Sequence, residues 1–319
     1  MMSEQLRLKH FPVSFFATTM GLSGLTIAWE KAEHTLQLPF QISPHLMWLV
    51  GALYLVLTAI YLIKIAGYPE ALTSELRHPV KLNFFPASSI SMILLSIVTL
   101  GHYPVLSQLL WLVGSAAHLF FTFYVMGAWI NHQHFEIHHM NPAWFIPVVG
   151  NILVPIAGVA HGYAEISWFF FAVGLLFWLV LLTIIFYRVI FHNPIPEKLV
   201  PTFFILIAPP AVGFLSYVKL TGEIDVFARL LYYGALFFTL LLFTQIAKFT
   251  RLQFFLSWWA YSFPMAAITV ATFVMYQNLG LAWFRGGATA LLVVLTLIIA
   301  LLVIKTLNAV ARKAICVEE

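Results

Sequence analysis

The stretch WWAYSFPM, residues 258–265, is the key to the chain, because it places an aromatic ring directly before a proline inside an apolar segment. Related pairs recur near the start or middle of four other apolar segments. They are Phe11 with Pro12, Phe85 with Pro86, Phe145 with Pro147, and the double proline Pro209 and Pro210. Five versions of one pattern predict a repeated architecture and a site where the repeats converge.

The composition is that of a membrane protein. Of the 319 residues, 62% are hydrophobic and only 9% are charged, which is too apolar for a soluble domain of this length. Apolar runs of about 20 residues match the length that a helix needs to cross a hydrocarbon core. The ten-residue alternation typical of an outer-membrane barrel is missing. We therefore expect an all-α integral membrane protein with a single transmembrane domain over residues 1–319 and short tails at about 1–10 and 305–319.

Ten helices are expected to cross the membrane. Their approximate ranges are 11–29, 43–66, 82–101, 105–130, 143–161, 166–190, 199–219, 227–249, 254–277 and 281–304. On this count, twelve of the 16 Lys and Arg residues fall on one side, and the other four, Lys31, Lys219, Arg229 and Arg285, fall on the opposite side. Because cytoplasmic loops collect positive charge, both termini are expected in the cytoplasm, with the protein in the cell inner membrane.

A second recurring mark lies in the even-numbered spans, where glycine follows an aromatic or leucine residue by three positions. The glycines are Gly51, Gly114, Gly174, Gly234 and Gly287. These glycines and the odd-span prolines Pro12, Pro86, Pro147, Pro209 and Pro264 both recur every 53 to 74 residues. The shared period predicts five helical hairpins that enter the membrane in the same direction, related by rotation about the membrane normal in a quasi-fivefold ring.

Polarity predicts which helix of each hairpin faces inward. The odd spans carry Ser, Thr, Asn and proline, whereas the sixth and tenth spans are almost entirely bulky and apolar. Polar side chains and proline breaks are tolerated where neighbouring helices or a water-lined cavity satisfy the backbone. We expect the odd helices to form an inner ring around a pore, with kinks at Pro12, Pro86, Pro147, Pro209 and Pro264.

The pore itself is predicted to be neutral. Asp, Glu, Lys and Arg occur only near the ends of the spans, whereas proton-coupled carriers usually place such groups inside the bilayer. A neutral pore can still select anions through hydroxyl and N–H donors and helix ends. Two other possibilities stay open at this stage: a carrier that uses His161 or an interfacial glutamate for coupling, and a membrane sensor without transport.

The loop after the fourth span raises the question of a metal site. It holds His132, His134, Glu136, His138 and His139. Histidines at this spacing can bind zinc or copper, although the metalloprotease pattern is excluded because Phe135 follows His134. We favour a polar interfacial loop and predict no metal and no cofactor. For His118, in the middle of an outer span, we expect an interhelical hydrogen bond.

Catalytic motifs are missing: the sequence has no phosphate-binding glycine loop, no nucleophile elbow and no zinc cysteine pair, and its one cysteine is Cys316 in the tail. An enzyme is therefore not expected. Nor is a nucleic-acid partner.

Together with Phe11-Pro12, Gly21-Leu22-Ser23 and Trp29, the stretch 258–265 resembles the tellurite-resistance/dicarboxylate transporter family, to which the plant guard-cell slow anion channels are related. The resemblance implies five hairpins in quasi-fivefold symmetry, a pore through each protomer of a homotrimer, and a phenylalanine, Phe263 in this chain, that occludes the pore. Family members conduct chloride and nitrate, or move dicarboxylates and sulfite, and tellurite resistance is the phenotype that names the family.

The expected function is thus an anion channel for small inorganic anions in the lipid bilayer, gated by Phe263 and associated with tellurite resistance. The alternative is a proton-coupled carrier of dicarboxylates or of oxyanions such as tellurite or sulfite.

Overall fold

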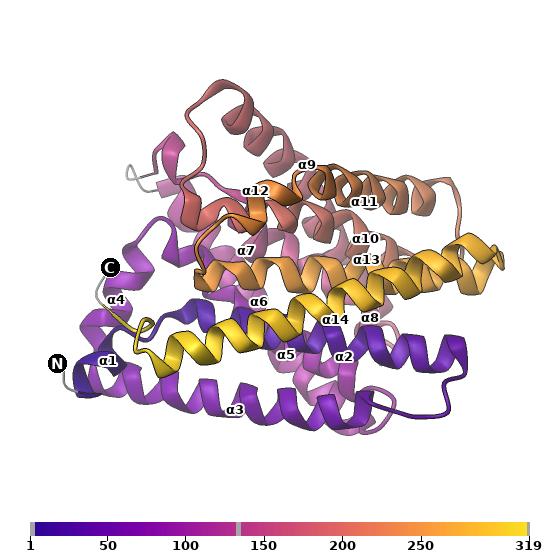
Figure 1. Cartoon of the computed structure of the whole chain (residues 1–319), viewed down its shortest axis with the longest axis horizontal. Helices are drawn as coiled ribbons and strands as arrows, with labels where there is room; N and C mark the ends of the chain where they lie inside the picture. The colour runs from indigo at the N-terminus through magenta and orange to yellow at the C-terminus, as the bar shows by residue number, and fades with distance from the viewer. Residues whose placement is uncertain (1–3, 132–134, 318–319) are drawn as a thin grey trace.

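The computed structural model describes residues 4–131 and 135–317, and within these ranges the secondary structure is helical, without strands. Long helices run side by side along the long axis of the molecule (Figure 1). Both chain termini lie at the same end of this axis, which we call the terminal end. The opposite end is the distal end.

The elements follow one another in an irregular mixture of long and short helices, where η denotes a 3₁₀ helix. In chain order they are α1 (Glu4–Lys9), η1 (Val13–Phe15), α2 (Phe16–Leu36), α3 (Ser43–Gly67), α4 (Pro69–Arg77), η2 (Lys81–Phe84), α5 (Pro86–Thr99), α6 (Pro104–Asn131), η3 (Ile137–His139), η4 (Pro142–Trp144), α7 (Phe145–Val149), η5 (Gly150–Leu153), α8 (Pro155–Gly158), α9 (Ala164–Phe191), η6 (Glu197–Ile207), α10 (Ala208–Thr221), α11 (Val226–Thr244), α12 (Ile246–Thr250), η7 (Leu256–Tyr261), α13 (Ser262–Leu279) and α14 (Ala282–Ala311).

Two kinds of segment alternate along the chain. The helices α3, α6, α9, α11 and α14 are continuous. Each is preceded by a segment that begins as a 3₁₀ helix and continues as an α-helix; these five segments are η1–α2, η2–α5, η4–α8, η6–α10 and η7–α13. We call these five the interrupted segments. The one over residues 142–158 changes three times between 3₁₀ and α. Proline explains part of this pattern, since it removes a backbone donor and clashes with the preceding turn.

The interrupted segments are the buried ones. About four-fifths of Lys81–Thr99, Glu197–Thr221 and Leu256–Leu279 is buried (78–83%), against 22–39% of the continuous helices. Within the described residues, eight helices are long and apolar enough to cross a membrane, namely these three and the five continuous ones. The first and fifth predicted spans, now α2 and the shorter Pro142–Gly158 segment, are not among the eight, so ten crossings stay a prediction.

Contacts between the interrupted segments form a closed circuit. α2 packs against α5, α5 against α7 and α8, α8 against α10, α10 against α13, and α13 against α2. Each interrupted segment also packs against the continuous helix that follows it in sequence. The polar, proline-containing segments thus lie inside a layer of continuous apolar helices, while the fivefold symmetry stays a prediction.

Side chains from neighbouring helices satisfy the broken backbone of residues 142–158. The carbonyl oxygen of Pro147 accepts a hydrogen bond from the Thr122 hydroxyl at 2.7 Å, and that of Val154 accepts one from the Trp111 indole at 2.8 Å. The Ser216 hydroxyl donates to the carbonyl oxygen of Ile152 at 2.5 Å. Such partners are required at membrane depth, because each unsatisfied backbone group costs several kcal/mol there.

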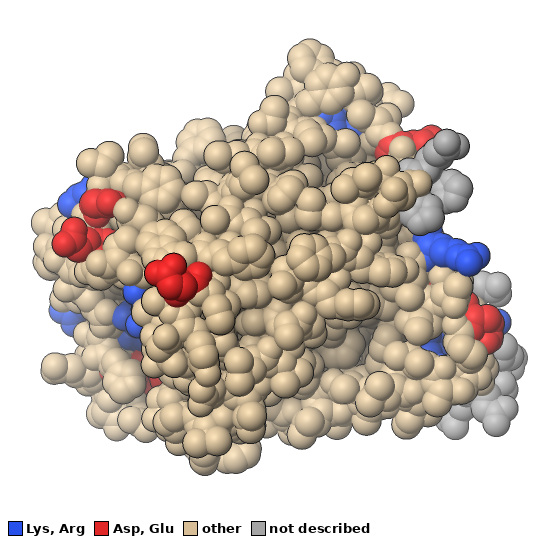
Figure 2. All heavy atoms as spheres, turned by 180° about the vertical axis from the view of Figure 1, so that it is seen from behind, with Lys and Arg blue, Asp and Glu red and all other residues tan. Residues whose placement is uncertain are grey.

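The surface has the charge distribution of a membrane-embedded body. On the face in Figure 2, charged side chains gather towards the two ends of the long axis and leave a broad uncharged middle. The continuous helices expose many large apolar side chains, for example Leu55, Phe120 and Leu297. These helices therefore present a surface suited to hydrocarbon.

Three predicted boundaries were wrong in detail. α2 continues to Leu36, past the predicted end at residue 29, because its last turns pack inside the protein through Ala32 and Glu33 instead of leaving the membrane. α14 continues to Ala311, so Lys305, which was assigned to the tail, lies within a helix. The eighth predicted span, 227–249, is divided into α11 and α12 at Gln245.

The periodic glycines do not share one packing role. A Cβ atom on Gly174 of α9 would lie 2.8 Å from the backbone nitrogen of Ile152, so this glycine allows α9 to approach η5 closely. Gly114 approaches α5 in a similar way, with the nearest atom at 3.0 Å. A Cβ on Gly51 would meet nothing within 4 Å. The shared period therefore marks the repeat, whereas close packing occurs at only some copies.

We expect Gly174→Ala to destabilise the protein by roughly 1–3 kcal/mol, because an added methyl in a well-packed interior forces the backbone to shift. Gly51→Ala is the matched control, since the same change on α3 meets open space. Thermal unfolding midpoints in detergent measure both variants. Equal midpoints would contradict the close approach of α9 to η5.

Candidate functional site

Two cavities lie inside the circuit of interrupted segments. The terminal cavity has a volume of about 240 Å³ and the distal cavity about 420 Å³. All five interrupted segments contribute side chains to both cavities. Among the described residues, none from α3, α6, α9, α11 or α14 lines either one. The cavities therefore belong to the inner layer alone.

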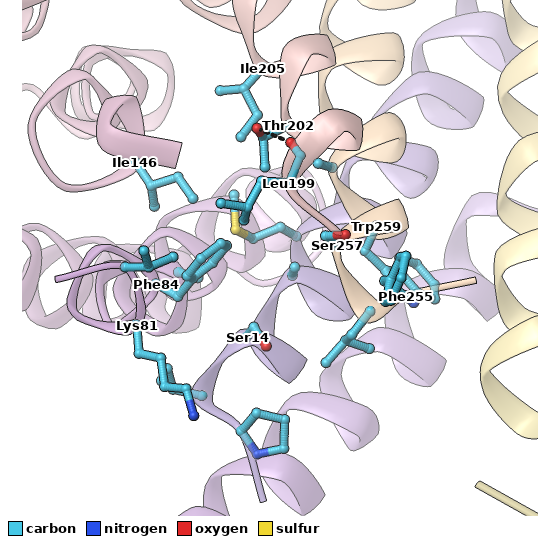
Figure 3. A pocket seen from close by; sticks show the side chains of 18 of the residues that line it. Ser14, Lys81, Phe84, Ile146, Leu199, Thr202, Ile205, Phe255, Ser257 and Trp259 are labelled. Atoms are coloured by element: carbon cyan, nitrogen blue, oxygen red, sulfur yellow. Dashed lines mark hydrogen bonds between the residues drawn. The ribbon is translucent and has the colours of Figure 1, made fainter. Parts of the chain in front are cut away.

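The walls of the terminal cavity are mainly apolar, and Figure 3 shows four polar lining residues among them, Ser14, Lys81, Thr202 and Ser257. The Thr202 hydroxyl donates to the carbonyl oxygen of Leu199 at 2.5 Å, and the Ser257 hydroxyl donates to that of Lys198, also at 2.5 Å. Two lysines line the same cavity: Lys81 is the first residue of η2, and Lys198 is the second residue of η6. Positive charge thus lies at the mouth and not in the depth of the cavity.

The distal cavity repeats this arrangement at the other end. Its charged lining residues are Glu30, Lys31 and Lys219, near the ends of α2 and α10. Towards the middle of the molecule its walls are apolar, with Leu153 and Val212 among them. The pathway that the two cavities define is therefore uncharged in its centre.

Among the described residues, Phe263 alone lines both cavities. It lies in the first turn of α13, directly after the 3₁₀ helix η7, and it is only half-buried despite its central position. Its ring is packed towards α2, where a Cβ on Gly24 would stand 3.4 Å from the ring atom Cδ2. This residue therefore borders both cavities.

The corresponding aromatic residues of the other repeats lie elsewhere. Phe11, Phe85 and Phe145 are at most 8% exposed, belong to apolar clusters and line neither cavity. The fourth repeat has Ala208 at the position before Pro209, and it lines the terminal cavity. Sequence periodicity treats these positions as equivalent, whereas the structure distinguishes Phe263 from the other aromatic residues.

The repeated prolines lie at or near the changes in helix type. Pro86 is the first residue of α5, Pro209 the second of α10 and Pro264 the third of α13. Pro12 directly precedes η1. Pro147 lies within α7. Three further prolines of the interrupted segments were not singled out from the sequence. They are Pro142, the first residue of η4, Pro155, the first residue of α8, and Pro201, inside η6.

The structure describes the second part of the histidine loop, from Phe135 onward. His132 and His134 lie outside the described residues. Glu136 forms an ion pair with His138 at 3.1 Å, and its backbone N–H donates to Nδ1 of His139, at the start of η3. The pKa of His139 is lowered, mainly by partial desolvation and to a lesser extent by the neighbouring His138. Within the described residues no group of three His, Cys, Asp or Glu side chains could hold a metal ion.

His118 and His161, the two other histidines considered from the sequence, contact neighbouring helices. His118 of α6 is fully buried, and its Nδ1 forms a 2.9 Å hydrogen bond with the Ser89 hydroxyl of α5, as expected for an interhelical contact. His161 bonds through Nε2 to the Ser107 hydroxyl at 2.9 Å. Neither side chain is among those that line the two cavities.

A buried ion pair beside the terminal cavity was missed by sequence analysis. Lys64 of α3, 1% exposed, forms a 2.8 Å ion pair with Glu75 of α4 and donates to the carbonyl oxygen of Phe11 at 2.8 Å. The Tyr61 hydroxyl also donates to Glu75, at 2.7 Å. The pair ties α4 to the chain that precedes η1, and Glu75 itself lines the cavity. The only available signal was a lysine that follows Tyr61 on the same helical face.

We expect Lys64→Met to destabilise the protein by about 3–5 kcal/mol, since it leaves the Glu75 carboxylate buried without its cation. The double variant Lys64→Met with Glu75→Gln removes both charges and should recover part of this loss. Chemical unfolding in detergent measures the three proteins. If the single and double variants were equally unstable, the coupling between the two charges would be refuted.

Taken together, a membrane-embedded helical body with two axial cavities defines a protein of the channel or transporter class. The model of the voltage-dependent anion channel family, SLAC1, matches residues 10–307. This chain belongs to that family.

Named relatives agree with this assignment. The chain is 33% identical to the S-type anion channel SLAH2 of Arabidopsis thaliana over 276 residues. This aligned stretch covers 83% of this chain and 52% of the relative. With the S-type anion channel SLAH3 of the same plant it shares 33% over 272 residues, 83% of this chain and 43% of the relative. The tellurite resistance protein TehA homolog of Haemophilus influenzae is 27% identical over 277 residues, 84% of this chain and 82% of the relative.

The chain thus spans about half the length of the two plant relatives. Both plant relatives are named as S-type anion channels.

Proposed function

We propose that this protein is a passive channel of the cell inner membrane for small inorganic anions of the chloride and nitrate type, closed by Phe263 in the present conformation. The observation that carries the proposal is the position of this ring as the shared wall of two cavities that extend towards opposite ends of the molecule. An aromatic ring at such a constriction excludes water and ions until it moves.

The architecture that we propose is one transmembrane domain over residues 1–319, with ten crossings as five hairpins in a quasi-fivefold ring. The closed circuit of contacts and the greater burial of the interrupted segments support the ring. The changes from 3₁₀ to α-helix near Pro12, Pro86, Pro147, Pro209 and Pro264 support kinks in the inner helices.

Electrostatics favours anions over cations. The centre of the pathway is apolar, and each mouth carries two lysines on inner segments, Lys81 with Lys198 and Lys31 with Lys219. Positive mouths raise the local concentration of anions, while a neutral centre does not trap them. The larger share of Lys and Arg at the terminal end supports a cytoplasmic location for both termini.

The carrier alternative has less support. Coupling to protons needs a titratable group on the pathway, and such groups mark coupling routes when they lie inside the bilayer. The titratable side chains along the two cavities, Glu30, His34, Glu75 and His78 among them, lie near the mouths, and His118 lies outside both cavities. A sensor without transport would not require two cavities that meet at one side chain.

The assembly and the phenotype rest on resemblance. A homotrimer would bury part of the apolar surface of the continuous helices between protomers, and the lipid bilayer would cover the remainder. A role in tellurite resistance follows from the name of the Haemophilus relative.

We expect Phe263→Ala to raise chloride and nitrate conductance on the order of tenfold or more over the wild-type protein in reconstituted bilayers, because the cavities then join. Phe84→Ala is the comparison variant: it removes the same ring from the wall of the terminal cavity alone and should leave the current near the wild-type level. Background current in the Phe263 variant would refute the channel.

A second measurement separates channel from carrier. For the Phe263→Ala protein, the reversal potential is expected to follow the chloride or nitrate gradient and to stay constant when the pH gradient is changed, since no proton moves with the anion. A reversal potential that follows pH would instead establish the proton-coupled carrier.

A further inference from the structure

Positive charge at the distal end is concentrated on the pathway. Of the four Lys and Arg residues assigned to this end, Lys31 and Lys219 line the distal cavity. They lie on α2 and α10, which are separated by α13 in the circuit of contacts, so they reach the cavity from different walls. The two ammonium groups thus bring like charges to one cavity. Like charges held together raise the free energy unless an anion lies between them.

Carboxylates of the protein do not supply that anion. Neither lysine forms an ion pair within the described part of the chain. Glu33 accepts hydrogen bonds from the backbone N–H and hydroxyl of Ser43, at 2.9 and 2.5 Å. The Tyr217 hydroxyl donates to Asp225 at 2.6 Å and lowers the pKa of this carboxyl, which is therefore ionised but already engaged.

Glu30 is the one carboxylate among the described residues that line the distal cavity. The mouth therefore has two positive charges and one negative charge, with His34 uncharged when its imidazole is neutral. A net positive charge remains for a ligand from solution.

α13 adds neutral donors between the lysines. Gln277 and Asn278 both line the distal cavity. One amide N–H of Gln277 is donated to the Thr35 hydroxyl at 2.7 Å, and one of Asn278 to the carbonyl oxygen of Val274 at 2.9 Å. Each amide has two N–H groups, so each keeps a second donor. Ammonium and amide N–H groups around one space make a ligand set for an anion with several acceptor oxygens or a high charge density.

We propose that Lys31 and Lys219, with the amides of Gln277 and Asn278, form a binding site for one small inorganic anion at the distal mouth of the pathway. The site collects the anion from the distal solution before it reaches Phe263. This proposal rests on the proposed channel function and adds to it the step that selects and concentrates the ion on this side.

The test compares two pairs of charge changes in the open Phe263→Ala background. One protein carries Lys31→Met with Lys219→Met. Its matched control carries Arg229→Met with Arg285→Met, which removes the same charge from the same end but from exposed positions of α11 and α14 outside both cavities. Currents are recorded in bilayers with sodium nitrate at about 10 mM, where screening is weak, and at about 1 M, where it is strong.

We expect the lysine changes to lower the nitrate current that enters from the distal side by roughly threefold or more at low salt and to have little effect at high salt. The arginine control should change this current much less. Glu30→Gln should have the opposite sign and raise the same current. Equal effects of the lysine and arginine pairs, or a lowered current with Glu30→Gln, would overturn the proposal.

A readout without conduction separates this site from the channel itself. Nitrate is titrated into the wild-type protein at constant ionic strength, with sodium gluconate as the replacement salt, and the thermal unfolding midpoint is followed. Binding to the folded state raises the midpoint. The rise is expected in the wild type and in the arginine control but not in the lysine variant. A rise of the same size in the lysine variant would refute the site even if the channel conducts, and a silent Phe263→Ala protein would refute the channel while this titration still decides on the site.

Discussion

The hydrogen bonds that close the gaps in the inner backbone are the constraint on which this structure depends. Residues 142–158 change helix type three times, and each change leaves carbonyl groups without the usual partner four residues on. In hydrocarbon such a group has no water to bind. Thr122 and Trp111 of α6 and Ser216 of α10 supply the missing donors. A broken inner segment is therefore stable only with its neighbours in place.

This dependence explains the division into two layers. A segment with proline, serine and asparagine cannot face lipid, but it can stand between donors on one side and a cavity on the other. The continuous helices have no such need, and their exposed surfaces are apolar. Polar groups of two inner segments also pair with each other: the hydroxyl groups of Thr19 on α2 and Ser91 on α5 form a hydrogen bond at 2.6 Å. Polar side chains in the inner layer thus serve the backbone first, which leaves the centre of the pathway apolar.

The large features of the fold could be predicted from the sequence, because they follow from patterns spread over many residues. Apolar runs located the spans, and the positions of Ser, Thr, Asn and Pro separated buried from lipid-facing helices. The predicted ends of helices were wrong where contacts with other segments, and not hydropathy, decide the end of a helix. α2 continues to Leu36 because Glu33 is held by hydrogen bonds from Ser43. The pair of Lys64 and Glu75 escaped notice because its partners come from different elements, and the two cavities depend on the side chains of five segments at once. Phe263 was singled out only by resemblance, since periodicity cannot show that Phe85 turns away from the axis.

The contact between Phe263 and the Gly24 position has a consequence for the speed of any opening. Exposed side chains change rotamer within picoseconds to nanoseconds, whereas the displacement of packed helices takes microseconds to milliseconds. In the proposed channel the moving part is one ring and not a helix, and Gly24 offers no Cβ on the facing side. Opening would then lie closer to the faster of these two timescales, and the lifetime of the open state would be set by whatever holds one aromatic side chain aside.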